Sequence, residues 1–182
     1  VYSTSSAPIT EINTSSISFN GSVNTYIATD GTQILNGWPA ATVSNWIRIT
    51  STTYNSWSNN SYHALLFKYR ILQTRLQKTS TGLKFIATHS DGTPFGTHIV
   101  STSTIPLNTW VNLVSVHQGT NVMLYINGQF AGSGSTGKTF GAASTDGLDI
   151  IGHGGNYSGL LDDLRLYNTA FSEAQVQQIP LQ

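Results

Sequence analysis

Short segments in which apolar and polar residues alternate make up most of this chain, and turn residues separate them. Alternation with a period of two is typical of strands, and Asn-Gly, Asp-Gly and Thr-Gly pairs mark turns. Many short strands at regular spacing are typical of an antiparallel sandwich or barrel. The pattern predicts strands at residues 17–19, 25–28, 41–50, 64–69, 71–77, 83–88, 97–101, 109–116, 121–126, 129–131, 148–151 and 160–167.

The clearest local signal is a hairpin at Asn127-Gly128, between the runs 121–126 and 129–131. Both turn residues tolerate the positive φ that a type I′ turn requires.

The stretch from Gly159 to Ile179 changes period halfway. Its first half alternates, and it places Asp162 among leucines on the side expected to be buried, where a carboxylate needs a partner. Its second half predicts a short helix that begins after Ser172 as N-cap, has Gln175 at the capping-box position and ends at Pro180. We therefore predict an all-β antiparallel β-sandwich over residues 15–182, with one short C-terminal helix, after an arm or linker remnant at 1–14.

Composition narrows the function classes. Charged residues make up 9% of the 182 residues, and 8 basic side chains balance 8 acidic ones. Nucleic-acid binding wants a basic excess, so we expect no nucleic-acid partner. We also expect no membrane span, because no apolar run is long enough. The polar, uncharged composition favours a secreted, cell-surface or virion-surface protein. There is no cysteine, so disulfides are excluded.

Five motifs, in this order, resemble the concanavalin A-like sandwiches, and within them the laminin G-like and pentraxin-like modules. They lie at residues 19–21, 43–47, 108–116, 123–128 and 161–168. The resemblance covers residues 15 to 180 and implies a jelly roll of two antiparallel sheets with a concave face that holds glycans in relatives. It does not imply one ligand, because a fold hosts many functions.

The resemblance also implies a structural calcium ion. In similar folds the acid at the start of the last strand is a ligand, beside backbone carbonyls near the first strand; here these positions are Asp162, Asn20 and Gly21. Calcium takes six to eight oxygen ligands. In the alternative, Asp162 accepts backbone N–H groups and no metal is bound.

The acidic residues do not form a catalytic pair. Glycosidases need two carboxylates that flank the bond, but the chain has only two Glu, at 11 and 173, and its acids at 30, 91 and 146 precede Gly in turns. Lyases of this fold use His, Tyr, Arg and Gln on facing strands, and a site could be drawn from Lys68, Tyr69, Arg70, Gln73 and Arg75 with His63 or His117. No His motif accompanies these residues, so we predict that the chain is not an enzyme.

Binding is the better-supported hypothesis. Sugar sites pair an aromatic face with planar amides and hydroxyls. The aromatic residues of the polar segments 51–62 and 153–158 are candidates, although each could instead fold back onto the core. The predicted ligand-binding residues are Tyr54, Trp57, Tyr62, Asn156 and Tyr157.

Two function classes follow. In the first, the chain is a glycan-binding or adhesion module of a larger secreted, cell-surface or viral attachment protein. In the second, it is a structural surface or decoration protein that contacts only other protein subunits, in part through residues 1–14. A polysaccharide-degrading enzyme of the same fold ranks third.

Overall fold

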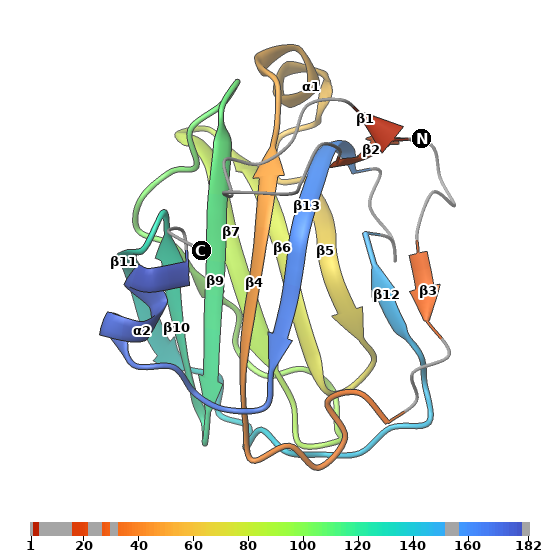
Figure 1. Ribbon diagram of the computed structural model, residues 1–182, viewed down its shortest axis with the longest axis vertical. Coiled ribbons are helices and arrows are strands. Elements are labelled where there is room, and N and C mark those ends of the chain that lie inside the picture. Colours follow the sequence, from red (N-terminus) through yellow and green to blue (C-terminus); the bar gives the residue numbers. More distant parts are fainter. Residues whose placement is uncertain (1, 4–15, 22–26, 30–32, 152–156, 180–182) are drawn as a thin grey trace.

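The computed structural model describes residues 2–3, 16–21, 27–29, 33–151 and 157–179. Their strands form two sheets that lie face to face, one of seven strands and one of six (Figure 1). Paired strands run antiparallel in both sheets. This arrangement confirms the predicted antiparallel β-sandwich.

The strand order in each sheet separates segments that are adjacent in sequence. The seven-stranded sheet contains, in spatial order, β1 (Tyr2–Ser3), β2 (Ser16–Asn20), β13 (Ser158–Tyr167), β4 (Ala40–Arg48), β9 (Trp110–Gln118), β10 (Asn121–Ile126) and β11 (Gln129–Ser135). The six-stranded sheet contains β3 (Ile27–Thr29), β12 (Leu148–Ile150), β5 (Tyr62–Lys68), β6 (Leu72–Thr79), β7 (Gly82–His89) and β8 (Ile99–Val100). Residues 4–15 of the predicted arm lie outside the described residues, whereas Tyr2–Ser3 pairs with β2.

Apolar side chains from both sheets meet between the layers and form the core. Ile47, Leu113 and Leu124 come from the seven-stranded sheet, and Leu76 and Phe85 come from the six-stranded sheet. All five are buried. Full burial of such a side chain stabilises the fold by roughly 1.5–3 kcal/mol, so this contact drives the two sheets together.

The C-terminal helix α2 (Glu173–Gln178) confirms the predicted helix. Ser172 is its N-cap, and Ser172 and Gln175 form the capping box. Val176 and Ile179 are buried. They pack on the outer face of the seven-stranded sheet, against Val114, Val116 and Tyr125 (Figure 1).

A second helix, α1 (Ser51–Ser56), forms where the sequence predicted only a polar loop. Thr50 is its N-cap. At its C-terminal end, Lys78 Nζ donates hydrogen bonds to the carbonyls of Tyr54 and Trp57, at 2.9 and 2.7 Å. A cation at this end of a helix satisfies carbonyl groups that have no partner within the helix. Because Lys78 comes from β6, nothing in the segment itself signals this helix. Neither helix in the described part of the chain has the length or apolar content to cross a lipid bilayer.

Strand β13 contains a β-bulge that changes which of its residues face the core. Asp162 lies opposite Trp46, but the next paired residue is Arg165, opposite Ser44, so β13 carries one extra residue here. Asp163, inside the bulge, has φ +46°.

The bulge overturns the predicted burial of Asp162. Leu161 packs in the core before the bulge, and Leu164 and Leu166 pack against it after the bulge. Asp162 therefore lies on the outer side and is partly exposed. Its carboxylate accepts the Asp163 N–H at 2.8 Å. Sequence alternation could not reveal this, because an inserted residue reverses the two sides of a strand.

The predicted Asn-Gly hairpin is confirmed. Asn127 and Gly128 have φ of +52° and +75°, the left-handed conformations that a type I′ turn requires.

Candidate functional site

The structure assigns the predicted ligand-binding residues to different environments. Trp57 and Tyr157 are only 8% and 2% exposed, so the prediction that they face solvent is wrong for both. Trp57 stacks on the ring of His63, with centroids 3.5 Å apart, and Tyr157 donates a hydrogen bond to the Leu160 carbonyl. Burying these large aromatic rings at the end of the core stabilises the fold more than leaving them in solvent does.

The other three predicted ligand-binding residues do not share this buried environment. Tyr54 is half-buried in α1, and its hydroxyl donates to the Thr79 carbonyl at 3.1 Å. Asn156 lies outside the described residues. Tyr62, at the start of β5, is 44% exposed and is the predicted aromatic residue that solvent reaches best.

The three predicted calcium ligands do not converge. Asn20 pairs with Ser158, whereas Asp162 lies four residues further along β13. At ~3.3 Å per residue, this separates Asp162 from Asn20 by about 13 Å, and Gly21 lies one residue further away. Within the described residues, no group of three or more His, Asp or Glu side chains is positioned to hold a metal ion.

Two neighbouring carboxylates nevertheless line one cavity beside the bulge. Asp162 and Asp163 both border a space of about 150 Å³. Asp163 Oδ1 accepts a hydrogen bond from Arg165 Nε at 2.7 Å, while its Oδ2 is buried and finds no hydrogen-bond partner in the described part of the chain. Such a pair offers oxygen ligands but needs further donors to make a calcium site. Calcium binding stays a prediction.

A different group of polar and aromatic residues meets on the outer face of the six-stranded sheet. Because Leu76 and Phe85 point into the core, their sequence neighbours point outward. Strand register then sets two adjacent rows on this face. One row contains Tyr62, Gln77 and Lys84, and the other contains Ala64, Arg75, Ile86 and Val100.

The centre of this group is Arg75. Its guanidinium carbon lies 4.4 Å from the centroid of the Tyr62 ring, and its Nη2 contacts His98 Nε2. Gln77 Nε2 donates to the Tyr62 hydroxyl at 3.0 Å. We call these four residues, Tyr62, Arg75, Gln77 and His98, the Arg75 cluster. An aromatic ring, an amide and a guanidinium side by side offer both stacking and directional hydrogen bonds.

The charges of the Arg75 cluster follow from its burial. Desolvation, and secondly the positive charge of Arg75, lowers the pKa of His98 to about 4, so His98 is neutral at pH 7. Desolvation also lowers the pKa of Arg75, with Tyr62 opposing it, but arginine starts so high that the guanidinium stays charged. A guanidinium only donates, so His98 Nε2 is the acceptor and its proton lies on Nδ1.

The loop after β7 brings His98 to the cluster. Thr88 on the outer face donates to the carbonyls of Gly96 and Thr97, so this loop folds over the sheet at the C-terminal end of β7. Phe95 in the same loop packs on Phe67, with ring centroids 5.9 Å apart. The loop thus covers the face around Thr88 and Phe67 and leaves the Arg75 cluster at its border.

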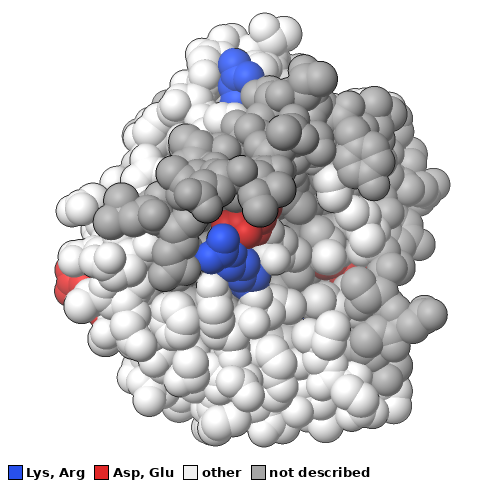
Figure 2. Space-filling model, viewed as in Figure 1, with Lys and Arg blue, Asp and Glu red and all other residues white. Residues whose placement is uncertain are grey.

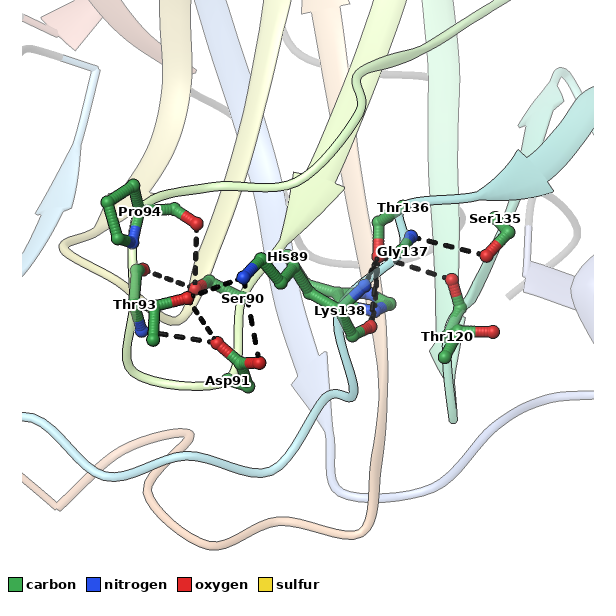
Figure 3. Close-up of polar contacts among 10 residues, drawn as sticks. All are labelled: His89, Ser90, Asp91, Thr93, Pro94, Thr120, Ser135, Thr136, Gly137 and Lys138. Atoms are coloured by element: carbon green, nitrogen blue, oxygen red, sulfur yellow. Dashed lines mark hydrogen bonds and ion pairs between the residues drawn. The ribbon is translucent and has the colours of Figure 1, made fainter.

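A polar network anchors the base of that loop (Figure 3). Lys138 Nζ donates to Thr93 Oγ1 at 2.8 Å and lies 3.8 Å from Asp91 Oδ2. The Lys138 carbonyl lies 2.8 Å from His89 Nε2, a buried ring at the end of β7. These contacts join the loop to the segment after β11, which supports a fixed position for His98.

The outer face of the seven-stranded sheet differs in its cover and charge. Helix α2 covers β9 and β10 there, and Figure 2 shows this side of the molecule with few charged atoms on it. Of the two sheets, therefore, the six-stranded one presents the exposed cluster of aromatic, amide and cationic side chains.

Sequence reasoning found one member of the cluster for its exposure, Tyr62, and considered Arg75 only for a lyase. Four of the other residues considered for catalysis lie apart from it. Lys68 is fully buried, Arg70 lies in a turn, and His63 and His117 point between the sheets. His98 and Gln77 carried no signal, because only the register of β5 with β6 and the fold of the loop bring them to Tyr62.

Comparisons with known proteins agree with this architecture. The binding domain of Paraclostridial Mosquitocidal Protein 1 superposes with a TM-score of 0.73 at 19% identity, over 92% of this chain and 43% of that one. A heptameric SAP-like pentraxin from Limulus polyphemus gives 0.62 at 20% identity, over 91% and 81%. Domain 4 of AbnA, a GH43 extracellular arabinanase from Geobacillus stearothermophilus, in complex with arabinotriose, gives 0.68 at 17% identity, over 97% and 79%.

At these identities the structural likeness shows the fold alone. The chain spans less than half the length of the mosquitocidal protein's binding domain. No curated protein matches the sequence. A laminin G-type family profile, described as the concanavalin A-like lectin/glucanases superfamily, matches residues 20–177. This match covers most of the chain, which therefore belongs to the concanavalin A-like lectin/glucanases superfamily.

Proposed function

We propose that this chain is a non-catalytic module that binds glycans through the outer face of its six-stranded sheet. The observation that carries the proposal is the Arg75 cluster, in which Tyr62 is exposed beside the Gln77 amide and the Arg75 guanidinium. Exposed aromatic rings with planar polar groups beside them match the alternating apolar and hydroxyl-bearing surfaces of a sugar.

The comparisons support a carbohydrate ligand but do not identify it. The AbnA domain is in complex with arabinotriose, and another similar structure, at a TM-score of 0.62 and 14% identity, is a putative carbohydrate binding protein from Bacteroides ovatus. The mosquitocidal neighbour is a binding domain. We infer an extracellular or surface location for the present chain, as part of a larger protein.

A glycan array screened with the folded chain tests this function. We expect binding to a defined glycan set, and loss of about fivefold or more in affinity in Tyr62→Ala, because stacking on an aromatic ring contributes roughly 1 kcal/mol or more. Phe130→Ala is the matched control, since Phe130 is 54% exposed on β11 in the other sheet. Silence of the folded chain on the whole array would reject glycan binding and favour the structural surface protein.

The same geometry allows a check on catalysis. His98 and Arg75 contact each other in the Arg75 cluster, and a lyase would need a base free to take a proton from the sugar. His98 Nε2 is occupied by Arg75, so we expect no cleavage. Formation of unsaturated or shortened products from any bound glycan, measured by ultraviolet absorbance and chromatography, contradicts the non-catalytic assignment.

A further inference from the structure

Arg75 is a cation whose neighbours supply no negative charge. Its guanidinium contacts the Tyr62 ring and the His98 imidazole, and no Asp or Glu of the described residues pairs with it. The acid that β12 contributes near this face, Asp149, lies opposite Phe67, away from the row of Arg75. The guanidinium is therefore held in place by contacts that leave its charge uncompensated.

Its hydrogen bonds are also incomplete. Arg75 Nε is buried and finds no acceptor within the described part of the chain. A buried N–H without a partner is destabilising, and it means that no protein acceptor at this nitrogen competes with a ligand for the guanidinium. His98 adds an N–H donor on Nδ1, because its Nε2 faces the guanidinium.

The remaining cation of the same face strengthens this electrostatic character. Lys84 lies in the row of Tyr62 and Gln77, and its Nζ donates to the Thr102 carbonyl at 2.5 Å. A carbonyl group satisfies a hydrogen bond but leaves the ammonium charge in place. Two cations thus lie in adjacent rows beside the exposed Tyr62 ring.

We propose that Arg75 makes this face selective for acidic glycans, by pairing with the carboxylate of a hexuronic acid residue whose ring lies against Tyr62. This inference rests on the proposed glycan-binding function. A carboxylate is planar and matches the guanidinium fork in a two-point, charge-assisted contact. A neutral hydroxyl at the same position supplies an acceptor but no charge.

The test uses pairs of glycans that differ only in the acid. Oligogalacturonate is compared with its methyl ester, and β-1,4-linked glucuronan oligosaccharides with cello-oligosaccharides, by isothermal titration. We expect the acidic member of at least one pair to bind about ten- to a hundredfold more tightly than its uncharged counterpart. The preference also weakens as salt concentration rises.

Variants of Arg75 test whether this residue causes the preference for acidic glycans. Arg75→Gln is expected to remove the difference between acid and uncharged counterpart, and Arg75→Lys to retain part of it, since lysine keeps the charge without the fork. Arg70→Gln is the matched control, because it removes the same charge from the turn at the far end of the same hairpin. Circular dichroism and thermal unfolding confirm that each variant is folded.

The outcomes separate the two proposals. Equal binding to acid and uncharged counterpart by the unmodified protein overturns the acidic selectivity and leaves glycan binding standing, whatever the variants do. A preference for heparin-derived sulfated oligosaccharides over both uronate series overturns the assignment of a carboxylate. Binding to neither member of any pair, together with silence on the array, overturns glycan recognition itself.

Discussion

The outer faces of the two sheets differ in whether a helix covers them. On the seven-stranded sheet, α2 covers Val114, Val116 and Tyr125 with Val176 and Ile179, and the face becomes a second, small core. On the six-stranded sheet no helix of the described residues covers the Arg75 cluster, whose members contact mainly one another. Residues on the first face therefore stabilise the fold, and we propose that those on the second bind a ligand.

The largest effect is expected at the covered face. Ile179→Ala should lower the free energy of unfolding by roughly 2–4 kcal/mol, because the side chain is 1% exposed and its removal leaves a cavity. Urea denaturation measures the loss. Glycan affinity, measured well below the unfolding transition, should not change. A loss of affinity in the folded variant would show that the face covered by α2 also contributes to glycan binding.

Lowering the pH is expected to destabilise the fold through two histidines that lie between the sheets. His117 is fully buried with its Nδ1 3.1 Å from Nδ1 of His89, and desolvation, followed by the neighbouring His89, holds the pKa of His117 well below its usual range. Desolvation also lowers the pKa of His89. Below pH ~6.5 the unfolded chain therefore binds more protons than the folded one, and stability falls with acid.

The loss should reach up to about 1.4 kcal/mol per pH unit for each histidine kept neutral. Urea titrations between pH 7.5 and 5 measure the slope, and His117→Gln should flatten it. His98→Gln should flatten it as well, because a folded-state pKa of about 4 keeps His98 neutral over this range. An unchanged slope in His117→Gln would show that the interior pair does not control acid stability.

Calcium is expected to have a smaller effect, at the bulge beside the covered face. Two carboxylates, Asp162 and Asp163, border the cavity there. We expect saturating calcium to raise the unfolding temperature by about 2–4 °C relative to a chelator, which corresponds to ~1 kcal/mol in a domain of this size. Asp162→Asn should abolish the shift, and Asp149→Asn should not. Equal unfolding temperatures with and without calcium argue against the metal.

The smallest change in stability is expected at the open face. Tyr62→Ala should alter the free energy of unfolding by less than about 0.5 kcal/mol, since the ring is 44% exposed. Urea denaturation beside the Ile179→Ala variant gives the direct contrast. A cost above 1 kcal/mol would mean that Tyr62 belongs to the structural framework and not to a recognition surface.

Local signals carried most of the fold. The period of two predicted the strands, Asn127-Gly128 predicted its hairpin, and Ser172 with Gln175 predicted the start of α2. Each of these elements depends on interactions within a few residues, so the sequence alone contained what was needed.

Features that depend on distant contacts escaped prediction. Helix α1 is completed by Lys78 from another strand, and the bulge at Asp163 reversed the expected sides of β13. The expected exposure of Trp57 and Tyr157 was wrong for the same reason. Aromatic residues in polar segments look exposed in a sequence, yet Trp57 found His63 to stack on, and the cluster around Arg75 exists only through strand register and a loop.

The ends of the two sheets bear on how this module behaves at high concentration. In the described part of the chain, β8, which ends one edge of the six-stranded sheet, is only two residues long. An edge this short offers few unpaired backbone groups to a strand from another molecule, which is how β proteins avoid edge-to-edge aggregation. The longer edge β11, at one end of the seven-stranded sheet, is interrupted in its pairing with β10 by an irregularity between Leu124 and Tyr125. These two edges thus offer a neighbouring sandwich little backbone to pair with.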